Sequence, residues 1–127
     1  MVKNKNADLT KRLSEVVVYG MQEKKAHEVV RLDLREIHSS LADFFVICHA
    51  DSHIQVAAIA KSVEDEVYKA LGIWPHHVEG QQNGEWILLD YFDLMVHIFK
   101  KDNRTLFAIE ELWGDAEKVA YEAPVTI

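Results

Sequence analysis

Seven histidines, a single cysteine and several aspartates are the residues of this chain whose chemistry could support catalysis or metal binding. His49, Asp51 and His53 form an H-x-D-x-H pattern, and a strand end that leads into a helix could bring such side chains together. Zinc sites take three or four ligands with supporting hydrogen bonds, however, and two-residue steps are not a helical ligand spacing. Polar caps and surface positions account better for the pattern, so we expect no metal and no cofactor.

Cys48 has no second cysteine with which to form an internal disulfide. It lies in the apolar run Phe44-Phe45-Val46-Ile47-Cys48, where a buried thiol behaves as a small hydrophobic group. His49 follows directly and would point to the opposite face of a strand, which argues against a Cys–His pair. We therefore expect no catalytic cysteine.

Two aspartates, Asp90 and Asp93, flank a turn between apolar segments. Side-chain hydrogen bonds to nearby backbone N–H groups are the usual role of aspartate at such a position. A catalytic pair would need further acids close by, and Glu64-Asp65-Glu66 reads as a solvated helix face instead. None of the five glycines has a phosphate-loop or dinucleotide spacing, so no catalytic residue is assigned.

Hydrophobic periodicity divides the chain into helices and strands. Helices are predicted over about 8–24, 53–71 and 103–113, and strands over 27–34, 43–49, 76–80, 86–91 and 94–99. Asp51-Ser52 and Asp102 supply the expected N-caps, and Gly72 the expected C-cap. Buried helix faces are expected to include Leu9, Leu13, Val16, Val17 and Met21 in the first helix, and Leu106, Ile109 and Trp113 in the last.

These elements predict an α/β fold with a mixed sheet of about five strands flanked by helices. The run 43–49 is apolar throughout, which is typical of a central strand covered on both faces. A βαβ unit around the second helix precedes an antiparallel meander. We expect one domain over residues 1–127 with a core of about 8–116, a polar N-terminal lead, and an irregular tail after Gly114.

Composition excludes several classes of protein. No apolar run approaches the length of a membrane span, and Met1 to Asp8 is not followed by the apolar segment of a signal peptide. The net charge of −7 disfavours a surface that grips nucleic-acid phosphates. We expect a cytoplasmic protein with no membrane partner.

The segment from Trp86 to Phe99 carries the strongest binding signal. Alternation places Trp86, Leu88 and Asp90 on one face and Ile87, Leu89 and Tyr91 on the other. An aromatic residue beside an aliphatic residue and a carboxylate is typical of a protein-binding hot spot. A core strand buried on both faces is the alternative.

An ordered set of short motifs resembles the RsfS family, also called Iojap or the ribosomal silencing factors. The motifs span roughly Leu9 to Ala116. They are Ser39-Ser40-Leu41-Ala42-Asp43-Phe44-Phe45-Val46-Ile47, Ser52 with Gln55-Val56, Val78-Glu79-Gly80, Trp86-Ile87-Leu88-Leu89-Asp90-Tyr91, Asp93 with Val96-His97-Ile98-Phe99, and Leu112-Trp113-Gly114-Asp115-Ala116.

The resemblance implies a nucleotidyltransferase-like fold without catalytic residues and a repressor of translation. Such a protein binds the large ribosomal subunit through ribosomal protein fourteen and blocks joining of the small subunit when nutrients are scarce. The resemblance also implies a homodimer when free, and we expect at most minor contact with rRNA. The partner-binding residues carried over are Trp86, Leu88, Asp90, Tyr91, Phe92, Asp93 and Leu94.

This chain departs from the family pattern at two of these motifs. Phe92 stands at a corner where the family commonly has glycine, and a bulky residue with positive φ would be strained there. Ile54 stands where a basic residue usually precedes the Gln-Val pair, so a contact made by that base is not carried over.

Two other functions remain open from the sequence. One is an enzyme, a nucleotidyl transferase or metal hydrolase using His49, Asp51 and Asp90. The other is a plain dimerisation module in which the Trp86 strand pairs with a second copy.

Overall fold

The computed structural model describes residues 5–37 and 42–123 of the chain, and only the backbone of residues 5–7. The elements in chain order are α1 (Lys5–Glu23), β1 (His27–Asp33), β2 (Phe44–Ala50), α2 (His53–Leu71), β3 (His77–Glu79), β4 (Trp86–Asp90), β5 (Leu94–Lys100), α3 (Lys101–Phe107), α4 (Ile109–Leu112) and β6 (Glu117–Tyr121). The first part of the Ser39–Ile47 motif and the polar turn at Ser39-Ser40 lie outside the described residues.

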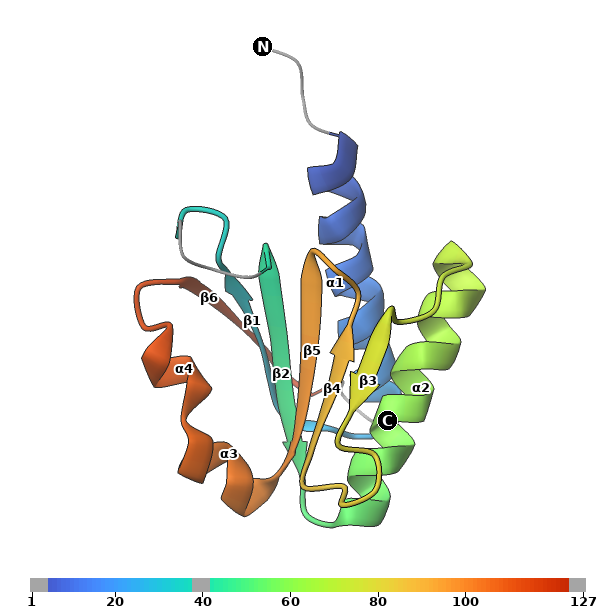
Figure 1. Cartoon of the computed structure of the whole chain (residues 1–127), viewed down its shortest axis with the longest axis vertical. Coiled ribbons are helices and arrows are strands. Elements are labelled where there is room, and N and C mark those ends of the chain that lie inside the picture. The colour runs from blue at the N-terminus through green and yellow to red at the C-terminus, as the bar shows by residue number, and fades with distance from the viewer. Residues whose placement is uncertain (1–4, 38–41, 124–127) are drawn as a thin grey trace.

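A six-stranded mixed sheet with the order β3-β4-β5-β2-β1-β6 forms the centre of the protein (Figure 1). The α/β class and the mixed sheet flanked by helices are confirmed. β2 is buried at all seven positions and lies between β1 and β5, as its apolar run predicts. β3, β4 and β5 form the predicted antiparallel meander.

The crossover after β2 is longer than a simple βαβ unit. β2 is parallel to β5, and the two antiparallel pairings of the meander make β3 parallel to both. Helix α2 thus carries the chain from the centre of the sheet to its far edge, and β4 and β5 fill the space between. Ser52 caps α2 by accepting from the Gln55 N–H over 3.1 Å, and Gly72 ends it with φ of 70°.

Helices α1 and α2 pack against each other and cover one face of the sheet (Figure 1). Gly20 permits the close approach, because a Cβ there would lie 2.9 Å from the Cα of Val63. Ser62 adds a hydrogen bond of 2.8 Å to the Gly20 carbonyl. Leu9, expected on the buried face of α1, is instead 58% exposed, whereas Leu13, one turn further along, is buried.

Four predictions about the C-terminal part of the chain are wrong. The tail after Gly114 is not irregular over its whole length, because Glu117–Tyr121 forms β6 and pairs with β1. The predicted single helix over 103–113 is divided at Ala108, whose φ of 46° interrupts it. Asp102 is not its cap, since the cap position is Lys100 with no side-chain hydrogen bond, and Leu106 is 74% exposed.

Candidate partner-binding surface

The second face of the sheet is only partly covered. Ile109 of α4 and Trp113 just beyond it pack on a cluster that includes Leu32 of β1 and Phe45 of β2. Over the meander, α3 lies against β5, where Phe107 contacts both Trp86 and Phe99, and no described helix lies over the remainder of this face (Figure 1). One half of this face of the sheet is therefore open.

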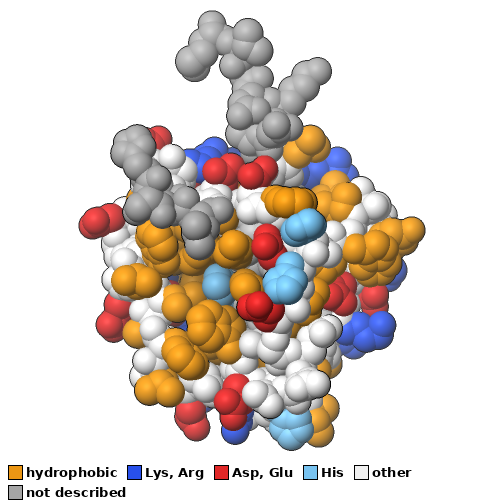
Figure 2. Space-filling model, viewed as in Figure 1, with side chains coloured by type: hydrophobic (Ala, Val, Ile, Leu, Met, Phe, Trp, Pro, Cys, Tyr) orange, Lys and Arg blue, Asp and Glu red, His pale blue; other side chains and the backbone are white. Residues whose placement is uncertain are grey.

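Cross-strand register fixes which residues share the open half, because directly opposed residues of antiparallel strands point to the same face. Three rows result, which together we name the open sheet surface: His77, Asp90 and Met95; Glu79, Leu88 and His97; and Trp86 with Phe99. Within these rows His97 and Phe99 are buried, so the accessible side chains are those of the other six residues. Figure 2 views this side of the molecule and shows hydrophobic side chains across its middle, with acidic and histidine side chains beside them.

Trp86 is held in place by aromatic contacts rather than left free. Its indole Nε1 donates to Nδ1 of His97 over 3.1 Å, and its ring centroid lies 4.9 Å from that of Phe99 and 4.8 Å from that of Phe107. Because burial disfavours the charged imidazolium, the pKa of His97 falls to about 3. A neutral ring with Nδ1 as acceptor therefore fixes the indole, which remains half-buried.

The corner between β4 and β5 continues the surface at one end. Oδ1 of Asp90 accepts from the Phe92 N–H over 2.8 Å, which is the turn role expected of this aspartate. Phe92 takes φ of 70° and is 63% exposed, and its ring centroid lies 4.2 Å from that of His76. The corner thus keeps the left-handed geometry suited to glycine and displays an aromatic ring on it.

Two acidic side chains, Asp93 and Asp43, lie at this corner, and Arg35 partly offsets the charge of Asp43. The carboxylate of Asp93 has no ion pair or hydrogen bond among the described residues. The pKa of nearby Asp43 is raised, first by burial and then by the negative charge of Asp93. Such a pair of carboxylates favours an approaching cation.

Two of the seven carried-over residues are not on this surface. Tyr91 is 6% exposed and Leu94 is fully buried, and both belong to the core under α1 and α2. Alternation along β4 already assigned Tyr91 to that face, so direct partner contact by these two side chains is not expected on the open surface.

Met95, His77 and Glu79 were missed by the sequence interpretation. Register with β4 places Met95 and His77 beside Asp90 and Glu79 beside Leu88. Nε2 of His77 lies 3.0 Å from Oε1 of Glu79, so the edge strand also carries a polar pair. Alternation in 94–99, combined with a hairpin register, is the signal that could have identified Met95.

The H-x-D-x-H residues do not converge. His49 is buried, whereas Asp51 and His53 are exposed, and Asp51 faces His27 at 3.6 Å. Among the described residues no group of three or more His, Cys, Asp or Glu side chains could hold a metal ion. Cys48 is buried, and this burial raises the pKa of its thiol, which keeps it protonated.

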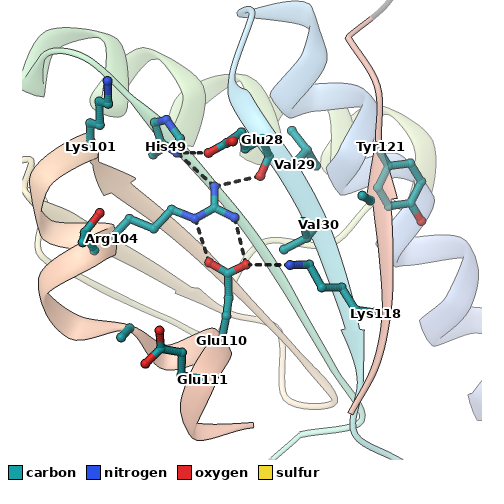
Figure 3. Close-up of a pocket in the computed structure, with 13 residues that line it drawn as sticks. Glu28, Val29, Val30, His49, Lys101, Arg104, Glu110, Glu111, Lys118 and Tyr121 are labelled. Atoms are coloured by element: carbon teal, nitrogen blue, oxygen red, sulfur yellow. Dashed lines mark hydrogen bonds and ion pairs between the residues drawn. The ribbon is translucent and has the colours of Figure 1, made fainter. Parts of the chain in front are cut away.

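A cavity of about 640 Å³ lies between α3, α4, β1 and β6 and is lined in part by His49 (Figure 3). Arg104 crosses it and uses all three of its nitrogens. It binds both carboxylate oxygens of Glu110, at 2.8 and 3.1 Å, the carbonyl of Glu28 at 2.7 Å and Nδ1 of His49 at 3.0 Å. Through these bonds Arg104 holds α3 and α4 to β1 and β2.

No described helix is both long enough and apolar enough to cross a membrane.

Fold and surface together define an α/β domain that presents a half-covered sheet with an aromatic, aliphatic and acidic face. A family model described as "Ribosomal silencing factor during starvation" matches residues 7–126. The chain therefore belongs to this family of ribosomal silencing factors.

Individual relatives agree with this family. The ribosomal silencing factor RsfS of Halalkalibacterium halodurans is 40% identical over 114 residues, which cover 90% of this chain and 96% of the relative. RsfS of Bacillus subtilis is 38% identical over 106 residues, which cover 84% of this chain and 88% of the relative. The chloroplastic protein Iojap of Zea mays is 32% identical over 77 residues, or 32% of that longer protein.

Solved structures give the same fold. A crystal structure of a Chromobacterium violaceum protein superposes with a TM-score of 0.77 at 31% identity, covering 82% of this chain and 85% of the other. A Bacillus halodurans crystal structure gives a TM-score of 0.73 at 37% identity, with 88% and 98% covered.

Proposed function

We propose that this protein represses translation by binding the large ribosomal subunit through ribosomal protein fourteen and sterically blocking the small subunit when nutrients are scarce. Membership of the silencing-factor family supports the ribosome as partner. The observation that carries the proposal is the open sheet surface, where Leu88 lies between Trp86 and Asp90 with no described helix above it.

The binding residues we propose are Trp86, Leu88 and Asp90 on the sheet, with Phe92 and Asp93 at the corner. Trp86 and Leu88 act as apolar anchors, and Phe92 adds an exposed ring that the family pattern lacks. Asp90 and Asp93 accept basic groups of the ribosomal protein. Charge then steers the encounter, and burial of the anchors sets how long the complex lasts.

Occlusion of this kind needs no chemical step, so we propose a binding protein and not an enzyme. It acts in the cytoplasm, is a homodimer when free, and makes at most minor contact with rRNA. The net charge of −7 limits such contact, because it disfavours phosphates while suiting a basic protein embedded among them.

A subunit-joining assay tests the proposal. Isolated large subunits are incubated with the protein, small subunits are added, and joined ribosomes are followed by sedimentation. Joining should slow in proportion to the large subunits occupied. An unchanged joining rate at saturating protein would refute the proposal.

The partner contact is tested with Asp93→Asn, because its carboxylate has no partner to lose among residues 5–37 and 42–123. Weaker binding to large subunits and a shallower dependence on salt are expected. Asp65→Asn on α2 is the matched control, since Asp65 forms an exposed i,i+4 pair with Lys61 on the opposite layer of the molecule. Equal salt dependence for both variants would exclude Asp93 from the contact.

A further inference from the structure

Helix α3 carries an exposed aromatic side chain to one end of the open sheet surface. Phe107, the last residue of α3, is 48% exposed. Its ring centroid lies 4.8 Å from that of Trp86 and 6.4 Å from that of Phe99. Phe99 is fully buried, whereas the indole of Trp86 is half-buried. A group that covers the accessible part of the indole therefore comes within reach of the Phe107 ring.

The core does not account for the aromatic ring at this position. No residue of α3 is buried, and about half of the Phe107 side chain stays in contact with solvent. Figure 2 shows hydrophobic side chains continuing from the middle of this face toward α3 at the lower left. Accessible aromatic rings that adjoin one another are typical of the energetic centre of a protein–protein interface.

Arg104 holds α3 in place from its inner side. It lies one turn before Phe107, and its side chain is only 10% exposed. Its bonds to the carboxylate of Glu110 and to the carbonyl of Glu28 are internal, so Arg104 itself faces away from a partner. Because α3 follows β5 directly and buries no residue of its own, these bonds govern where Phe107 lies beside Trp86.

We propose that α3 forms one wall of the partner-binding site, with Phe107 as a direct contact beside Trp86 and Arg104 as the residue that positions it. This inference rests on the proposed function and extends it from the sheet to a helix. One side chain of the protein partner packs against both rings, so that Trp86 and Phe107 act as a single anchor. A stacked base of rRNA is the alternative occupant, and the net charge of −7 disfavours its phosphates.

Phe107→Ala is the first test. Affinity for isolated large subunits should fall about tenfold, as expected for the loss of an aromatic contact. The free energy of unfolding should change little, because the ring is half-exposed. Leu106→Ala is the matched control: Leu106 is 74% exposed on the same helix and, one residue earlier, points about 100° away. Equal affinities of the two variants would overturn the proposal.

A double-mutant cycle tests whether the two rings act together. In the Trp86→Ala background, Phe107→Ala should weaken binding by less than about threefold, because the group that contacted both rings has already lost its site. Losses that simply add would show that Phe107 acts apart from Trp86, and the single anchor would be wrong. The comparison of Phe107→Ala with Leu106→Ala does not depend on the stability of Trp86→Ala.

Arg104→Lys tests the positioning role. Lysine cannot keep both bonds to Glu110, so affinity should fall about threefold when Phe107 is present. In the Phe107→Ala background the same substitution should leave affinity unchanged, because no ring remains to be positioned. The free energy of unfolding should fall in both backgrounds. An equal loss of affinity in both backgrounds, or none in either, would exclude the positioning role.

Binding to protein-free large-subunit rRNA separates the two occupants. Phe107→Ala should bind this rRNA as the unaltered protein does, and a loss equal to that for large subunits would assign the ring to a base and overturn the proposal. The proposed function fails separately, if the unaltered protein does not bind large subunits. If Trp86→Ala weakens binding and Phe107→Ala does not, the proposed function stands and only the role of α3 is excluded.

Discussion

The indole of Trp86 and the imidazole of His97 form a hydrogen-bonded pair across β4 and β5, with 3.1 Å between Nε1 and Nδ1. The donor is an indole N–H, so Nδ1 of His97 carries no proton, and the proton of the neutral ring is on Nε2. That second nitrogen is buried without a partner among the described residues. The orientation of the main proposed anchor therefore depends on His97 remaining neutral.

Acid should destabilise the protein through this pair. The pKa of His97 is about 3 when folded and about 6.5 in the unfolded chain, so only the unfolded chain takes up the proton between these values. The free energy of unfolding should thus fall as pH drops below about 6.5, by up to about 1.4 kcal/mol per pH unit. Burial and the positive charge of Arg104 also lower the pKa of His49. Protonation of His49 in the unfolded chain therefore also lowers the free energy of unfolding as the pH falls.

Urea unfolding between pH 7 and pH 5 measures the effect. The control is His97→Gln, whose amide oxygen can still accept from the indole but does not titrate. Its free energy of unfolding should depend less on pH than that of the unaltered protein. The same slope in both would show that His97 is not the group responsible.

Leu88 gives the cleanest test of the open sheet surface. Leu88→Glu places a charge at its centre without removing a residue of either core cluster, and should weaken binding to large subunits by about 2 kcal/mol. Leu112→Glu, at a residue 75% exposed on α4, should bind normally. Trp86→Ala should weaken binding to large subunits at least as much. Its free energy of unfolding must be measured alongside, because the substitution also removes the N–H that donates to His97.

Phe92 allows strain and contact to be separated. Phe92→Gly removes a bulky residue from φ of 70° and should raise the free energy of unfolding by about 1 kcal/mol. It also removes the exposed ring, so affinity for large subunits should fall. A variant that is more stable but binds less well would show that the ring is kept for contact; equal binding would assign Phe92 no role in it.

Arg104 should be the main fastening of α3 and α4 to the sheet. Neither helix contains a buried residue, and Arg104→Lys cannot keep the paired contacts with Glu110. The free energy of unfolding should fall by about 2 kcal/mol. Hydrogen exchange should increase first at 101–112, and an even increase over the whole chain would contradict this role.

Local chemistry was sufficient to predict some elements from the sequence. β2 could be predicted because a strand buried on both faces must be apolar throughout. α2 could be predicted because Ser52 and Gly72 mark its ends. The edge strand β6 could not be predicted, because its residues are exposed or half-buried and its sequence lacks a strong alternation of apolar and polar residues.

Other features depended on contacts that no local pattern contains. Periodicity continues across Ala108, so the break between α3 and α4 could not be seen. The open sheet surface could be predicted in part, because alternation separated Leu88 from Tyr91. Its neighbours on β3 and β5 could be identified only from the strand register.

The place of β6 in the sheet has a consequence for how the protein is made. β1 is among the first elements synthesised, yet one of its edges pairs only with the last strand, at 117–121. While the chain is still being translated, that edge keeps its N–H and C=O groups unpaired. β6 therefore joins the sheet only after residues 117–121 have left the exit tunnel, and a nascent chain stalled before residue 117 exposes an edge able to pair with other strands.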